Sequence, residues 1–260
     1  MKVPNLRTAS VFLALVALAL PAGTPAASEA RAPAVDQSAV DTLKRMTDFI
    51  GGLKEFSVRT VNTYEDQLDS GQRIDLDVAA DVTVRRPNKV HANRSGARIS
   101  QDFYYDGKTL TLYNPSDDVY ASESVPGTIA EMLDYAREDL GLIVPASDLV
   151  YPNAFDILMQ GVTSAVVVGK VSIGGVTCDH LAFHRPDVDF QVWVASGDRP
   201  LPCKYVVTDT STPENVSTVT VMSDWDLAPK APDTEFRFVP PEGAQAISFM
   251  PLEKTKGSGR

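Results

Sequence analysis

The sequence is poor in the residues that most often build catalytic and metal sites. It has three histidines and two cysteines in 260 residues. It contains no GxSxG elbow, HExxH pair, P-loop or GxGxxG turn, the motifs that mark serine hydrolases, zinc peptidases and nucleotide-binding sites. We therefore predict a protein that is not an enzyme and that holds no cofactor.

Two of the histidines, His180 and His184, are close in sequence. They are four apart on a predicted strand, so their side chains share a face but lie about 13 Å apart, and one metal ion cannot bind both directly. A bend in the segment could still gather them with Asp179, Asp187 and Asp189. That arrangement would favour a hydrolase or a metal-dependent enzyme, a less favoured hypothesis. Solvated polar residues at a hairpin are the alternative, and we predict no metal site.

Long apolar runs are also lacking. The run Val11 to Leu20 is too short to span a bilayer, but it follows the basic residues Lys2 and Arg7 and precedes a stretch of small residues. This pattern is typical of a cleavable signal peptide, which we place at residues 1–26; an uncleaved anchor is the alternative. No cysteine lies near the cleavage region, which argues against a lipid anchor. We predict a periplasmic protein without a permanent membrane anchor.

Positive charge is scarce. The chain has 24 Lys and Arg against 34 Asp and Glu, a net charge of −10. Cleavage of the predicted signal removes two basic residues and no acid, which takes the charge from −10 to −12. Such a surface repels nucleic acid, so we predict no nucleic-acid partner. It does not exclude burial of a lipid tail, which depends on local apolar surface.

The two cysteines, Cys178 and Cys203, both follow the predicted signal. In an oxidising compartment an isolated pair predicts a disulfide, with two free thiols as the alternative. If one strand separated the two residues, their Cα atoms would lie about 9–10 Å apart, which is too far for a bond. The disulfide therefore requires adjacent strands or a bent strand end.

Periodicity predicts many strands and few helices. Apolar residues at helical spacing predict helices at 40–53, 128–140 and 153–160. Alternation and turn residues predict strands at 56–64, 74–84, 89–94, 99–105, 109–113, 119–123, 163–171, 176–184, 190–195, 204–209 and 216–227, with a last short strand at 235–239. Short links, such as Asp106-Gly107, indicate antiparallel hairpins.

So many strands cannot stay in one flat sheet. We expect a mainly β protein with helices (α+β), whose large curved antiparallel sheet forms a half-barrel with helices covering its concave face. We place this single domain at residues 36–252, between a flexible leader (27–35) and a flexible tail (253–260). A cavity between sheet and helices would bind an apolar ligand; a packed core is the alternative. The predicted lining residues are Phe103, Tyr105, Leu133, Leu140, Phe183 and Trp193.

Four segments carry a family resemblance. They are YDGKTLTLY at 105–113, CDHLAF at 178–183, DVDFQVW at 187–193 and GDRPLPCK at 197–204. Together they resemble an uncharacterised family of bacterial predicted periplasmic proteins, which is related to the superfamily of the outer-membrane lipoprotein carrier LolA. The resemblance implies an incomplete antiparallel barrel plugged by helices, and in characterised relatives the cavity takes lipid acyl chains. It assigns no ligand-contacting residue.

These observations favour a periplasmic binding or carrier protein for a lipid or another hydrophobic small molecule, including the acyl chains of a lipoprotein. The rival hypothesis is a non-catalytic structural or interaction module of the envelope, with a filled core and an envelope protein partner.

Overall fold

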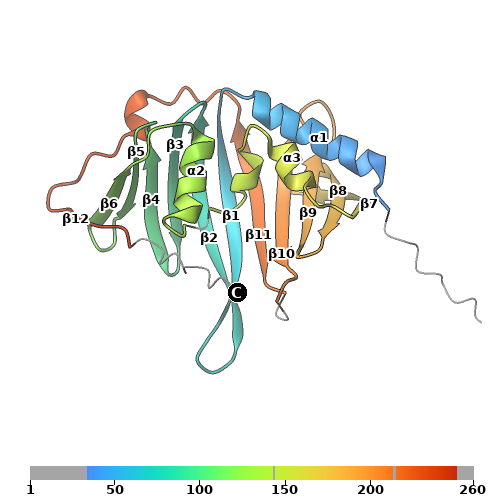
Figure 1. The fold of residues 1–260 in the computed structure, drawn as a ribbon, viewed down its shortest axis with the longest axis horizontal. Coiled ribbons are helices and arrows are strands. Elements are labelled where there is room, and N and C mark those ends of the chain that lie inside the picture. Colours follow the sequence, from blue (N-terminus) through green and yellow to red (C-terminus); the bar gives the residue numbers. More distant parts are fainter. Residues whose placement is uncertain (1–33, 143, 213–214, 251–260) are drawn as a thin grey trace, which may run out of the picture. The chain divides into compact units, whose positions relative to one another are not determined.

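Segments of alternating apolar and polar residues pair into one open sheet in the computed structural model (Figure 1). The strands are β1 (Glu55–Gln67), β2 (Arg73–Arg85), β3 (Lys89–Gly96), β4 (Ile99–Tyr105), β5 (Thr109–Asn114), β6 (Val119–Ser124), β7 (Ser164–Ile173), β8 (Val176–Arg185), β9 (Val188–Ala195), β10 (Pro202–Asp209), β11 (Ser217–Asp226) and β12 (Gln245–Ile247). Their order in the sheet is β12-β6-β5-β4-β3-β2-β1-β11-β10-β9-β8-β7.

Two antiparallel meanders make up most of this sheet. Strands β1 to β6 form the first and β7 to β11 the second, and they join where β1 pairs with β11. The short strand β12 adds to β6 in parallel. The turn between β4 and β5 shows why the links are short: the Asp106 carboxylate accepts hydrogen bonds from the N–H groups of Lys108 and Thr109, and Gly107 supplies a positive φ of 92°.

The structure describes residues 34–142, 144–212 and 215–250. The predicted signal peptide (1–26) and the predicted tail (253–260) lie outside the described residues. Val35, the last residue of the predicted leader, forms an isolated parallel bridge with Ala165 at the start of β7. None of the described helices combines the length and apolar character that a bilayer crossing requires.

Three α-helices lie on one face of the sheet, which we call the inner face: α1 (Gln37–Gly52), α2 (Ile129–Glu138) and α3 (Ala154–Met159) (Figure 1). Short 3₁₀ turns occur at η1 (Ser147–Leu149) and η2 (Asp233–Phe236). The Asp36 side chain caps α1 by accepting from Ser38 N–H, and helical spacing then buries Leu43, Met46 and Ile50. The helix lies against β7, β8 and β9.

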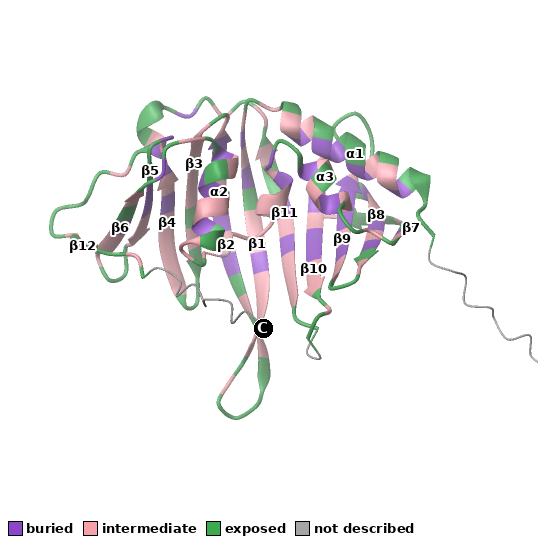
Figure 2. Cartoon of the chain, in the orientation of Figure 1, coloured by how far each residue is buried: buried purple, intermediate pink, exposed green. Residues whose placement is uncertain are grey.

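The main core fills the space between the inner face and the helices, and Figure 2 shows the buried bands of the helices and central strands. This arrangement confirms the predicted mainly β fold with helices over one face of a curved sheet. A polar pair interrupts the apolar layer where the two meanders meet. Thr220 Oγ1 donates to Asn62 Oδ1 at 2.8 Å, and Asn62 Nδ2 donates to Thr60 Oγ1 at 3.2 Å, so these buried groups satisfy one another.

The strand predicted at 235–239 is wrong. The segment begins within η2, and the last strand of the sheet is β12 instead. The two aromatic residues of the 235–239 segment pack against side chains of the sheet. Phe236 is buried beneath the Arg85 guanidinium, and the Phe238 ring lies 5.0 Å from that of Tyr120. Alternation here reflects two separate ring contacts and not a pleated backbone.

Candidate functional site

Helix α2 lies over the inner face of the sheet and has a well-defined start. Thr128 and Glu131 form a reciprocal capping box, which satisfies two N–H groups of the first turn. Gly127 precedes the helix with a φ of 150°, and Gly141 follows it with a φ of 66°. A side chain at Gly127 would be strained by that φ and would approach Glu131 Oε2 to 2.5 Å. Glycines therefore set the chain direction at both ends of α2.

The layer beneath α2 is apolar and closely packed. Ile129, Met132, Leu133 and Ala136 are buried against side chains that include Phe103 and Tyr105 of β4. Two of the predicted lining residues thus meet a third, Leu133, in one layer.

Tyr105 ties this layer to the segment that leads into α2. Its hydroxyl lies 2.9 Å from the carbonyl oxygens of both Val125 and Gly127. Burial, assisted by the nearby Glu131 and Asp106 carboxylates, raises the pKa of Tyr105 to about 12. The phenol therefore remains protonated at neutral pH and acts as a hydrogen-bond donor that holds the start of the helix.

A crevice of about 190 Å³ lies between α2 and the connector that follows it. Its lining residues are Leu133, Arg137, Leu142, Val144, Ser147 and Asp148. Burial raises the pKa of Asp148, and the Arg137 and Arg185 guanidinium groups oppose that shift. The crevice thus combines an apolar wall with a partly desolvated carboxylate.

The connector residues of this crevice were missed by the sequence analysis. Irregular segments have no periodicity, so nothing in the pattern indicates which side chains turn inward. One signal was present: Asp148 is the sole charged residue between Gly141 and Tyr151. A lone carboxylate in such an apolar stretch is either buried or at the boundary between the core and solvent.

A second inner cluster lies under α1 and α3. The Phe183 and Phe190 rings stack with centroids 4.6 Å apart, and Tyr205 meets Phe190 edge-on at 6.3 Å. Burial raises the pKa of Tyr205, so this phenol also stays neutral. Leu140, just after α2, is partly buried against the same core.

Trp193 is on the other face of the sheet. It stacks on His180 with centroids 4.0 Å apart and packs with the two cysteines, while the Lys204 ammonium lies 4.8 Å from its ring centre. The structure therefore brings Phe103, Tyr105 and Leu133 together, places Phe183 and Leu140 in the same core, and separates Trp193 from all of them. Adjacent residues alternate across a strand, so Val192 and Val194 take the inner positions.

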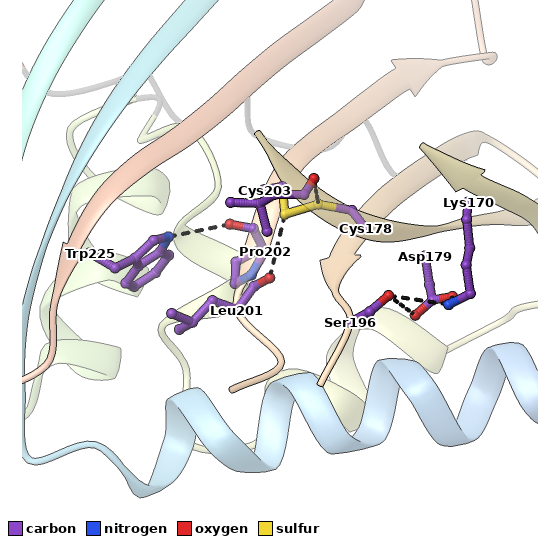
Figure 3. The surroundings of a disulfide bond; sticks show 9 residues. Lys170, Cys178, Asp179, Ser196, Leu201, Pro202, Cys203 and Trp225 are labelled. Carbon is purple, nitrogen blue, oxygen red and sulfur yellow. Dashed lines mark hydrogen bonds and ion pairs between the residues drawn. A yellow bond between two sulfur atoms is a disulfide. The ribbon is translucent and has the colours of Figure 1, made fainter. Parts of the chain in front are cut away.

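Cys178 and Cys203 form a disulfide on this outer face (Figure 3). Cys178 belongs to β8 and Cys203 to β10, so β9 does separate them. Their Cα atoms are 7.0 Å apart, less than two regular strand spacings. The pairing of β9 with β10 slips between Pro202 and Lys204, which places Cys203 at a bulge. The bond therefore uses the bent strand end that the sequence analysis required.

An open apolar hollow of about 400 Å³ lies beside the disulfide. Its walls include Ile173, Ala195, Leu201, Pro202, Cys203 and Trp225. Trp225 Nε1 donates to the Pro202 carbonyl at 3.3 Å (Figure 3).

The histidine cluster has ordinary polar partners. His180 Nε2 lies 2.9 Å from Gln191 Oε1, and His184 Nδ1 lies 2.5 Å from Asp189 Oδ1. Asp179 instead pairs with Lys170 and accepts from Ser196 at 2.9 Å (Figure 3). Within 34–142, 144–212 and 215–250, no group of three or more His, Cys, Asp or Glu side chains is placed to hold a metal ion.

Comparison with curated proteins gives no match. Among solved structures, lipoprotein LppX of Mycobacterium tuberculosis is 16% identical over 73% of this chain and 96% of its own, with a TM-score of 0.43. LprF of Mycobacterium bovis is 14% identical over 82% and 99%, with a TM-score of 0.46. The LolA superfamily protein NE2245 of Nitrosomonas europaea is 14% identical over 77% and 97%, with a TM-score of 0.38.

A family model matches most of the sequence, from residue 39 to residue 250. The match includes all the described helices and strands except the first two residues of α1. Its description agrees with the periplasmic location predicted from the sequence. The chain belongs to the family described as predicted periplasmic protein (DUF2092).

Proposed function

We propose that this protein binds a lipid or another apolar ligand between the inner face of the sheet and α2, and carries it through the periplasm. The observation that carries the proposal is the construction of α2. It covers an apolar layer, has a glycine at each end, and borders a crevice whose wall includes Leu133 of that layer.

The crevice is smaller than the roughly 300–1,000 Å³ of typical small-molecule sites, so binding requires α2 to move outward. Exposing Ile129, Met132 and Leu133 would cost about 1.5–3 kcal/mol each, or about 5–9 kcal/mol together. Burial of ten methylene groups contributes about 8 kcal/mol. Burial of an acyl chain of ordinary length therefore offsets the free-energy cost of moving α2 outward. Because the two free energies are similar, binding and release of the ligand are reversible.

The proposal is tested on protein purified from the periplasm without detergent. Native mass spectrometry would reveal a co-purified lipid, and the delipidated protein would bind the uncharged fluorophore N-phenyl-1-naphthylamine. Leu142→Trp fills the crevice and should weaken binding of the fluorophore at least about tenfold, equal to about 1.4 kcal/mol. Ile157→Trp, at a partly buried position on α3, is the matched control and should leave binding unchanged.

The rival function is an envelope interaction module with a filled core. The exposed valines of the edge strand β7, Val166 and Val168, favour it, because an open edge can pair with another strand. Wild-type protein that carries no lipid and binds no fluorophore would refute the carrier proposal and leave this module as the better account.

A further inference from the structure

A half-buried arginine beside α2 has two side-chain nitrogen atoms without a hydrogen-bond partner among the described residues. Arg86 follows β2, and its Nε and Nη2 atoms are shielded from solvent without a hydrogen-bond partner in the described part of the chain. Burial lowers the pKa of Arg86, and no carboxylate offsets the shift. Arginine nevertheless stays charged in proteins, so a partly desolvated cation is held here.

The neighbouring arginine shows the ordinary arrangement. The Arg85 guanidinium pairs with Glu55 at 3.1 Å and with Asp233 at 2.6 Å, and its pKa is raised mainly by its hydrogen bond to Glu55. It also covers the Phe236 ring on the outer side. Arg85 thus has two carboxylate partners, whereas the described residues supply no carboxylate that shifts the pKa of its neighbour Arg86.

Arg86 lies where the layer beneath α2 begins. Its N–H donates to the Lys54 carbonyl just after α1, and the next residue, Pro87, accepts from Ile129 N–H at the start of α2. In β2 the inner-face positions are those of Val82 and Val84, which pack in the main core. Alternation therefore directs Arg86 inward and Arg85 outward.

A partly desolvated charge without a partner is unfavourable, and a bound anion would relieve that cost. We propose that Arg86 binds the anionic end of the ligand, a carboxylate or a phosphate attached to an acyl chain. The guanidinium fork matches both groups through two parallel hydrogen bonds. The acyl chain would then extend beneath α2. This inference rests on the proposed function and adds to it the chemical class of the ligand.

The experiment measures displacement of N-phenyl-1-naphthylamine from delipidated protein by oleate, 1-oleoyl-lysophosphatidate and oleyl alcohol. The wild type should bind one or both anions about tenfold to a hundredfold more tightly than the alcohol, the range of a charged hydrogen bond. Whichever anion loses more affinity in Arg86→Met identifies the group that the site prefers. Arg86→Met should abolish the preference, and Arg86→Lys should keep part of it.

The same variant has a second readout that does not depend on ligand. Replacing a partly buried charge that lacks a carboxylate partner by an apolar side chain should raise the melting temperature of ligand-free Arg86→Met by about 2–4 °C. Arg85→Met removes two ion pairs, so it should lower the melting temperature and leave the preference for anions intact.

The outcomes separate the two proposals. If the wild type binds all three probes equally, or if Arg86→Met keeps the preference, Arg86 is not the anion site although the carrier function stands. A lower melting temperature of Arg86→Met would also overturn the inference, since it would mean that the charge has a stabilising partner in the ligand-free protein. If no probe binds, the carrier function itself fails.

Discussion

The disulfide should supply a large part of the stability of the folded protein. Cys178 and Cys203 are 25 residues apart, and closing a loop of that length lowers the entropy of the unfolded chain. The chain-entropy relation gives about 3.5 kcal/mol at 25 °C for such a loop. For a domain of this size about 1 kcal/mol shifts the melting temperature by about 2–4 °C, so loss of the bond should lower it by about 7–14 °C.

The perturbation is the double variant Cys178→Ala/Cys203→Ala, with reduction of the wild type as an independent route. Alanine is chosen because Cys178 is fully buried and a serine hydroxyl there would lack a partner. Thermal unfolding is followed by circular dichroism with and without a thiol-free reductant.

The reductant should shift the wild type and leave the double variant unchanged. A shift below about 2 °C in the wild type would refute the reasoning, because the cross-link would then constrain the unfolded chain no more than two free thiols do.

Three further perturbations test the layer between sheet and helices. Tyr105→Phe removes the hydroxyl that bonds the carbonyls before α2, so it should lower the free energy of unfolding by about 1–3 kcal/mol and speed amide hydrogen exchange in α2. Asn62→Leu leaves the Thr220 hydroxyl without its acceptor and should cost about 1–3 kcal/mol in urea unfolding, whereas Asn62→Leu/Thr220→Val should recover at least half of that loss. Asp148 has a pKa raised by burial, so the native state binds its proton more tightly than the unfolded state. Its contribution to stability is therefore lost as the pH rises above the ordinary value of 3.8, and Asp148→Asn should remove that decline when unfolding is measured across pH 3 to 7. Equal pH profiles of the variant and the wild type would contradict the assignment.

The pairing of the strands was predictable because local signals agree with one another. Around Asp106-Gly107, alternation, a turn with positive φ and a side chain that caps the turn all specify the same hairpin. Helix α2 was predictable for a similar reason, since its capping residues and its apolar spacing coincide.

Features that depend on distant parts of the chain were not predictable. The candidate lining set joined Phe183 to Trp193, although these residues occupy opposite faces, because the sequence cannot say which face of each strand the helices will cover. The bulge at Cys203 arises from a slip between β9 and β10 that no local motif encodes. The missing hydrogen-bond partners of Arg86 likewise appear only once the neighbouring described residues have been placed.

The packing of α1 has a consequence for the order in which the protein can fold. This helix leaves the ribosome before any strand, yet it lies on β7, β8 and β9, which are made after the whole first meander. Contacts so distant in sequence form late and slowly. A nascent chain therefore lacks the surface that fixes its first helix until β7, β8 and β9 have been synthesised.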